Sequence, residues 1–157
     1  MTAAAATARA AARSGGMIRP LALCLALLAA PALAQDPDLD AWTARTAVED
    51  YFAAIDAGGY AAAWAMWDDG GAASGQTAAA FAEGFDETGA VAVFTGPLLS
   101  MEGAAGSIYA NVPVRIEAEL KDGTAQHFAG TFVMRRANGV PGADPGWRIS
   151  AADVAPE

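Results

Sequence analysis

The segment Ser107–Leu120 constrains the fold more than any other part of the sequence, because apolar and polar side chains alternate along it. A period of two places every second side chain on one face of a β-strand. A short turn, Lys121–Gly123, follows, and a second alternating segment, Gln126–Arg136, comes after it. The pattern predicts a long antiparallel hairpin that is buried on one face, and it excludes an all-helical chain.

The turn of this hairpin has two candidate registers. A two-residue Asp-Gly turn would set the phenylalanines of the second strand beside Glu117 and Glu119. A three-residue loop with Gly123 in a left-handed bulge pairs Leu120 with Thr124 and makes one face entirely apolar. Since a one-residue slip would mix the faces, we expect the bulged turn. Its pairs are then Val112 with Phe132, Val114 with Gly130 and Ile116 with Phe128 on the apolar face, and Glu117 with His127 on the other.

A helical period precedes the strands. The first helix is expected to start at Thr46, which is spaced from Glu49 as a capping box, and to stop at the glycine pair 58–59. A start near Asp40, with Trp42 on the buried side, is the alternative. The apolar stripe that defines this helix consists of Val48, Tyr51, Phe52 and Ile55.

Two shorter helices are expected next, and two more strands complete the set. One helix spans Tyr60–Trp67, with Trp64 in its aromatic stripe. After a glycine-rich turn over residues 68–75, another helix spans Gln76–Asp86 and buries Phe81 and Phe85. The further strands are residues 90–94, before the main hairpin, and a last strand that carries Trp147, Ile149 and Ala151.

The first 34 residues are typical of a secretory signal. They hold three arginines and no acid, followed by the apolar run Leu21–Ala30 and then small residues at Ala32 and Ala34. We expect cleavage after Ala34 and a periplasmic or secreted product, with Met17 as the true start. The rest divides into an acidic lead-in, 35–41, one domain, 42–154, and a tail, 155–157.

Two other interpretations fit this segment less well. A membrane anchor needs about 20 apolar residues, more than the run provides. A lipoprotein signal typically places a small residue before the acylated cysteine, whereas Leu23 precedes Cys24. No membrane attachment is therefore expected after cleavage.

Charge excludes one class of partner. All 18 acids but only six of the nine bases lie beyond residue 34, so the processed chain would carry a net charge of −12. Such a surface repels phosphate backbones, and we expect no nucleic-acid binding. With one cysteine and one histidine in the chain, no metal site and no cofactor are predicted either.

Helices followed by a long antiparallel sheet form an α+β arrangement. In its first two helices (residues 47–67) and closing strands (112–136 and 147–154), the chain resembles the NTF2-like superfamily, which includes ketosteroid isomerases and polyketide cyclases. The resemblance implies three N-terminal helices packed on a curved antiparallel sheet, a cone with a pocket at its wide mouth, and often a homodimer through the outer sheet face.

This resemblance assigns places to the residues. A small apolar ligand would meet pocket-lining side chains from the helices and from the inward sheet face, although the same side chains could simply fill the cone. The candidates are Tyr51, Trp64, Trp67, Phe85, Val112, Val114, Phe128, Phe132 and Met134.

An acid–base enzyme of this type needs an ionisable group inside the pocket. The hairpin register puts His127 on the outer face, and no Asp, Glu or His lies on the inward face of the two long strands. Asp68 falls in a turn. The arginines at 115, 135, 136 and 148 are expected to be exposed on the strands and to face the acids of the chain, with a basic pocket edge as the alternative. No catalytic residue is therefore assigned. We expect a non-catalytic binding or interaction domain, with an isomerase or lyase as the alternative.

Overall fold

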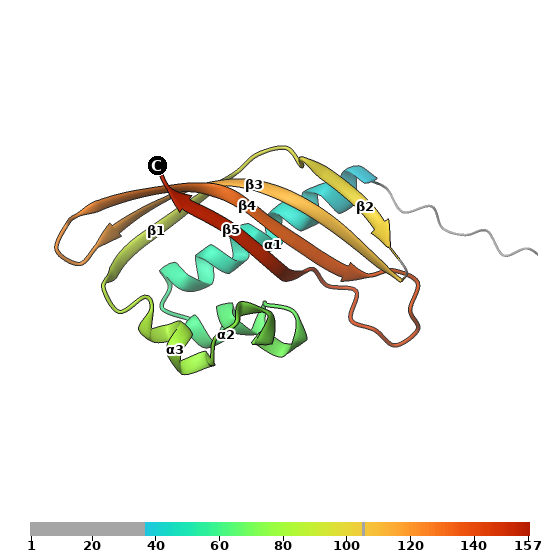
Figure 1. Cartoon of the computed structure of the whole chain (residues 1–157), viewed down its shortest axis with the longest axis horizontal. Helices are drawn as coiled ribbons and strands as arrows, with labels where there is room; N and C mark the ends of the chain where they lie inside the picture. Colours follow the sequence, from blue (N-terminus) through green and yellow to red (C-terminus); the bar gives the residue numbers. More distant parts are fainter. Residues whose placement is uncertain (1–36, 105) are drawn as a thin grey trace, which may run out of the picture. The chain divides into compact units, whose positions relative to one another are not determined.

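The computed structural model describes residues 37–104 and 106–157, so the expected signal segment lies outside the described residues. Helices come first along the chain and a single antiparallel sheet follows, which confirms the α+β class (Figure 1). The helical elements are α1 (Pro37–Asp56), α2 (Tyr60–Ala65), the 3₁₀ helix η1 (Asp69–Ser74) and α3 (Ala78–Glu83). The strands are β1 (Thr88–Thr95), β2 (Ser100–Ala104), β3 (Ser107–Leu120), β4 (Ala125–Ala137) and β5 (Arg148–Pro156).

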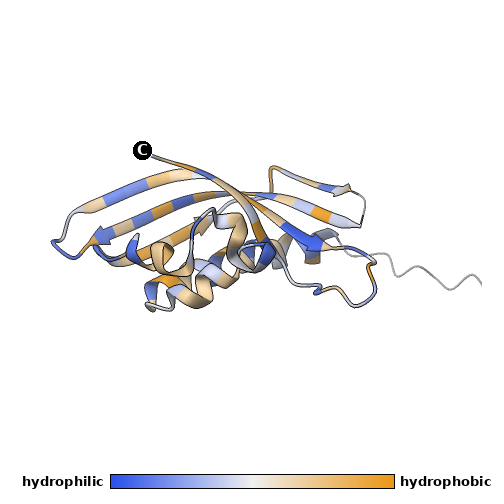
Figure 2. Cartoon of the chain, turned by 60° about the horizontal axis from the view of Figure 1, so that its bottom comes forward, coloured by the Kyte–Doolittle hydropathy of each residue, from blue (hydrophilic) through white to orange (hydrophobic). Residues whose placement is uncertain are grey.

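The sheet is built around the long β3–β4 hairpin. Its strand order is β1-β3-β4-β5, and β2 pairs with the first part of β3, beside β1 along the same edge. The strands arch over the helices, which all lie on one side of the sheet (Figure 1). Hydrophilic and hydrophobic bands alternate along the long strands, as a sheet buried on one face requires (Figure 2).

The predicted hairpin register is confirmed. The backbone N–H of Leu120 donates to the carbonyl of Thr124 at 2.9 Å, and Gly123 has a φ of 87°, in the left-handed region of the bulged turn. Val112 then pairs with Phe132, and the other predicted pairs follow in step, including Glu117 with His127. The apolar face of the hairpin therefore turns toward the helices as a continuous surface.

The predicted start of the first helix is wrong. Helix α1 begins at Pro37, inside the segment expected to be a lead-in, and the supposed capping-box residues lie within the helix. Proline fits the first helical position, because the N–H that it lacks has no intrahelical partner there. The acids at 38 and 40 favour the positive end of the helix dipole. Trp42 is 61% exposed, so it does not share the buried side.

Other element bounds also differ from the prediction. Helix α3 is one short segment, begun by Thr77, whose hydroxyl accepts from the N–H of Ala80 at 3.2 Å. Strand β2 was not predicted, and β5 runs to Pro156, into the expected tail. Among residues 37–104 and 106–157, no helix is long and apolar enough to cross a membrane.

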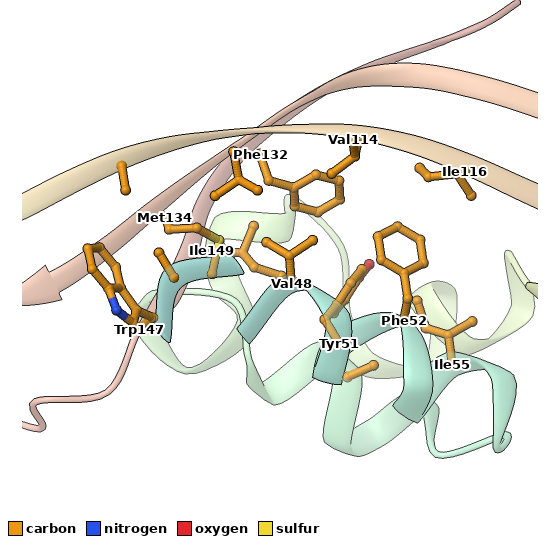
Figure 3. Packing of buried hydrophobic residues seen from close by; sticks show 14 of the residues in the cluster. Val48, Tyr51, Phe52, Ile55, Val114, Ile116, Phe132, Met134, Trp147 and Ile149 are labelled. Carbon is orange, nitrogen blue, oxygen red and sulfur yellow. The ribbon is translucent and has the colours of Figure 1, made fainter. Parts of the chain in front are cut away.

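The core lies between α1 and the inward face of the sheet (Figure 3). Tyr51 and Phe52 project from α1 toward the sheet, and both rings contact Phe132 at centroid distances of 5.8 and 5.6 Å. At the other end, Trp147 closes the core beside the start of α1, where its Nε1–H donates to Thr43. The helix is thus held against both long strands along most of its length.

Candidate apolar binding site

A cavity of about 270 Å³ lies between the helices and the sheet, and we name it the mouth cavity. Its wall is aromatic and aliphatic, with two neutral polar side chains and no Asp, Glu or His. Residues from α1, the segment after α3 and four strands line it. They are Phe52, Gly84, Phe85, Thr88, Val91, Ile116, Ala118, Gln126, Phe128 and Val154.

A second cavity, of about 300 Å³, shares the wall made by Gly84 and Phe85, and we name it the inner cavity. It is more polar than the mouth cavity, because a phenol, an indole, a hydroxyl and an amide side chain line it. Its other residues are Tyr51, Trp67, Ser74, Gln76 and Phe81. The two cavities therefore offer an apolar compartment and a compartment with hydrogen-bonding groups on either side of one aromatic residue.

The end of α3 positions this aromatic residue. The helix stops at Glu83, and the chain continues through Gly84 into the turn before β1. Phe85 stacks on Tyr60 with a centroid distance of 5.5 Å and an interplanar angle of 7°. It also contacts Phe81 at 5.1 Å, so rings from α2 and α3 fix its place between the cavities.

Tyr51 is the titratable side chain of the inner cavity. Its side chain is 4% exposed, and burial raises the pKa of its hydroxyl to about 12. The indole N–H of Trp67 favours the phenolate and opposes this effect only in part. Since the hydroxyl keeps its proton at neutral pH, it can donate a hydrogen bond but cannot act as a base there.

Comparisons with known proteins test the architecture. No family model matches the sequence, and no curated protein matches it. One similar solved structure, from Streptomyces avermitilis, is described as a dehydratase of the NTF2-like family. It is 16% identical in sequence, with a TM-score of 0.54, and the match covers 78% of this chain and 99% of that chain. The chain has the NTF2-like fold. A protein assigned as an aromatic ring hydroxylase from Novosphingobium aromaticivorans is also similar, with 16% identity, a TM-score of 0.53, and coverage of 78% and 96%.

The NTF2-like cone brings some of the predicted pocket residues together and buries the others. Among the nine candidates, the mouth and inner cavities are lined by Tyr51, Trp67, Phe85 and Phe128. Four others do not line either cavity and belong to the packed core, where side chains from α1 and β5 fill the space in front of them. These are Val112, Val114, Phe132 and Met134.

Trp64 lies apart from both cavities. Its ring covers the backbone of η1, where a Cβ on Gly71 would come within 2.4 Å of the indole. Its Nε1–H donates to the carbonyl of Gln76 at 3.1 Å. The side chain therefore fastens the glycine-rich segment to α2, and it does not line the mouth cavity or the inner cavity.

Several lining residues escaped the prediction. Gln126 and Thr88 supply the neutral polar groups of the mouth cavity. The register held a signal for Gln126, because that residue pairs with Ala118 and has the same inward parity as Phe128. The hydrophobic pattern gave no such signal for Thr88, which lies at a register shift between β1 and β3.

The ionisable candidates lie elsewhere. His127 is exposed on the outer sheet face, as the register predicted. Asp68 caps η1 through its contact with the N–H of Asp69, and it forms an ion pair with Arg135 at 2.9 Å. Within the described part of the chain, no cluster of three His, Cys, Asp or Glu side chains could hold a metal ion.

Four arginines of the sheet form ion pairs with acidic side chains. Each arginine faces one carboxylate partner, as expected, but Arg136 is buried and not exposed. Three of them, Arg135, Arg136 and Arg148, also line a hollow of about 310 Å³ whose wall includes the acidic partners of Arg135 and Arg148. The pairs are Arg115 with Glu157, Arg135 with Asp68, Arg136 with Asp40, and Arg148 with Asp144. They join strand ends to helices and loops, and none of these arginines lines the mouth or inner cavity.

Proposed function

We propose that this NTF2-like domain binds a small apolar ligand in the mouth cavity and does not transform it. The observation that carries the proposal is the wall of that cavity, in which phenylalanine and aliphatic side chains surround two neutral polar groups. Concave apolar sites with few polar groups are typical of small-molecule binding. Burial of aromatic surface of the ligand would supply the affinity.

The volume limits the ligand. An apolar protein cavity of about 150 Å³ holds one benzene molecule. The mouth cavity, at about 270 Å³, therefore has room for about two fused rings. We expect a flat bicyclic hydrocarbon such as indane to fit within it, whereas a four-ring steroid would extend beyond it into solvent.

An acid–base isomerase or lyase is the alternative function. It requires a group near the ligand that exchanges a proton near neutral pH. Tyr51, the titratable group of the inner cavity, has a pKa of about 12 and is poorly matched to that task. The similar solved structures carry enzyme assignments, but at 16% identity their likeness concerns the fold alone. The geometry therefore favours binding.

Titration calorimetry with indane tests the proposal. We expect saturable binding of one molecule per chain, and a loss of at least about tenfold in affinity when Ala118→Leu places a larger side chain in the mouth cavity. Ala92→Leu is the matched control, since Ala92 points to the outer face of β1 and pairs with Glu117. The absence of saturable binding, or equal affinity in both variants, would contradict the proposal.

We also propose that two copies associate through the outer sheet face. Phe94 is 55% exposed there, beside a shallow groove of about 590 Å³ that small and apolar residues of β3 and β4 also line. The same face carries Arg115 and Glu117, whose opposite charges can pair across a two-fold axis. Native mass spectrometry should give a dimer, which Phe94→Glu converts to monomer. A monomer before the substitution would refute this.

We propose from the sequence of residues 1–34 that the protein is exported. Helix α1 begins at Pro37, three residues beyond the expected cleavage site at Ala34, so cleavage there would leave the described fold complete. The intact mass of the protein recovered from the exported fraction of its host should equal that of a chain that begins at Gln35. A mass that retains the preceding residues, with or without lipid, would overturn the proposal.

A further inference from the structure

The hollow of about 310 Å³ lies where the end of β4 and the start of β5 meet the loop before β5 and the first residues of η1, and we name it the charged hollow. It shares no lining residue with the mouth cavity or the inner cavity. Its chemistry also differs from theirs, because charged side chains of both signs line it. They are Asp68, Asp69, Arg135, Arg136, Asp144 and Arg148.

Two guanidinium groups come from neighbouring strands at this hollow. Arg135 of β4 and Arg148 of β5 lie directly opposite each other in the strand register. Like charges in such positions destabilise a sheet, whereas a pair of opposite charges would stabilise it. Pairing of the strands therefore gives no reason for two arginines here. A carboxylate ligand does, because guanidinium groups bind carboxylates through paired, charge-assisted hydrogen bonds.

Two carboxylates hold these guanidinium groups in place. Asp68 accepts from the next backbone N–H with Oδ1 at 3.0 Å and from Arg135 with Oδ2 at 2.9 Å. Asp144 accepts from the backbone N–H two residues on with Oδ1 at 2.8 Å and from Arg148 with Oδ2. That backbone N–H and, after it, the guanidinium lower the pKa of the Asp144 carboxyl. The charges of the hollow are therefore fixed in position, as a binding site requires.

Binding capacity remains on both kinds of group. A guanidinium has five N–H donors, and within the described residues the bonds to Asp68, Asp144 and the carbonyl of Ala65 use only some of them. Asp69 is a further carboxylate of the wall, and its side chain has no partner among the described residues. The hollow can therefore both donate to an anionic group and pair with a cationic one.

The balance of charge selects the ligand. Two guanidinium groups face three carboxylates in the hollow, and its third arginine, Arg136, is neutralised by Asp40 from α1. The net charge is therefore close to zero. A doubly charged ligand of either sign would meet like charges, whereas a ligand with one charge of each sign finds a partner for both.

We propose that the charged hollow is a second ligand site, which binds a free α-amino acid through its zwitterionic head. The carboxylate of the ligand accepts from Arg135 and Arg148, and its ammonium group pairs with Asp69. The methyl groups of Ala65 and Ala143 leave room beside the charges for a side chain. This site is independent of the proposed function in the mouth cavity, so either proposal can fail without the other.

Three probes that share one hydrocarbon part test the inference. L-Valine carries both charges, isovalerate lacks the ammonium group, and isobutylamine lacks the carboxylate. We expect the full-length protein to bind L-valine at least about tenfold more tightly than either analogue in titration calorimetry at low salt, because each analogue loses one set of charge-assisted hydrogen bonds. Absence of saturable L-valine binding, or equal binding of isovalerate, would overturn the inference.

Variants assign the two ends of the ligand. Asp69→Asn should weaken L-valine binding about tenfold and leave isovalerate unaffected, and asparagine tolerates the φ of 57° at this position. Arg148→Gln should weaken both of these probes. Arg115→Gln is the matched control, because Arg115 pairs with Ala129, six residues or about 20 Å along β4 from Arg135. L-Valine affinity that survives both hollow variants, or that falls equally in the control, would overturn the inference, whereas indane binding would be untouched.

Discussion

Removal of the Asp40 carboxylate should strongly destabilise the domain. Asp40 lies in the first turn of α1, and its Oδ2 accepts from Nη2 of Arg136 in β4 at 2.6 Å. The two side chains are only 15% and 8% exposed. The guanidinium also lies over the ring of Trp147, with 5.2 Å from Cζ to the centroid. This ion pair joins the start of α1 to the end of β4.

The magnitude follows from burial. When one partner of a buried ion pair is removed, the other is left as an uncompensated charge, at a cost of about 3–5 kcal/mol. Nε of Arg136 already has no partner within the described residues, so Asp40→Ala would leave the cation with little beyond the aromatic contact. We expect a loss of about 3 kcal/mol in the free energy of unfolding. The exposed pair of Arg115 and Glu157, at 3.6 Å, supplies the contrast, with about 0–1 kcal/mol expected for Glu157→Ala.

Urea unfolding followed by circular dichroism measures these effects. The double variant Asp40→Ala with Arg136→Met should regain at least about 1 kcal/mol relative to Asp40→Ala alone, because the stranded charge is gone. The loss of a favourable charge at the helix N-terminus, up to about 1 kcal/mol, persists in the double variant and so cancels from the comparison. If Asp40→Ala costs no more than Glu157→Ala, or if the two substitutions simply add, the reasoning from burial is refuted.

Three further predictions concern single residues. Absorbance at 295 nm should show a tyrosine that ionises near pH 12, and Tyr51→Phe should abolish this step. Because a tyrosine in the unfolded chain ionises near pH 10, the free energy of unfolding should fall by on the order of 2–3 kcal/mol between pH 10 and pH 12. An unchanged titration in the variant would contradict the assignment. Gly123→Ala should cost about 1–2 kcal/mol in urea unfolding, since φ is 87° in the hairpin bulge, and a neutral result would argue against that turn. Gly130→Ala should cost about 3 kcal/mol, because its Cβ would lie 2.0 Å from the carbonyl oxygen of Asp153 in β5, and wild-type stability would disprove that close approach.

The sheet could be predicted from the sequence more fully than the helices. In Ser107–Leu120 the alternation extends over a whole strand, so a slip by one residue would expose every apolar side chain, and the pattern alone selects the register. The start of α1 lacks such a signal. Its first turn is polar and begins with a proline, and Trp42 points to solvent, so the hydrophobic period starts well inside the helix.

The candidate site could be predicted only in part. The pattern identifies which side chains face inward, but it does not determine where they leave space. Phe132 and Phe128 are both inward on β4, yet the first is enclosed by the rings of Tyr51 and Phe52 and the second lines a cavity. This difference depends on where α1 ends over the sheet and on the turn after α3 that brings in Phe85, and neither is encoded by a local period.

Buried charge in this domain lies far from the mouth cavity. The charged side chain buried on the inward face is Arg136, and Asp40 neutralises it. Arg136 lies eight residues along β4 from Phe128, which is about 27 Å at 3.4 Å per residue. A ligand in the mouth cavity is therefore out of reach of that cation.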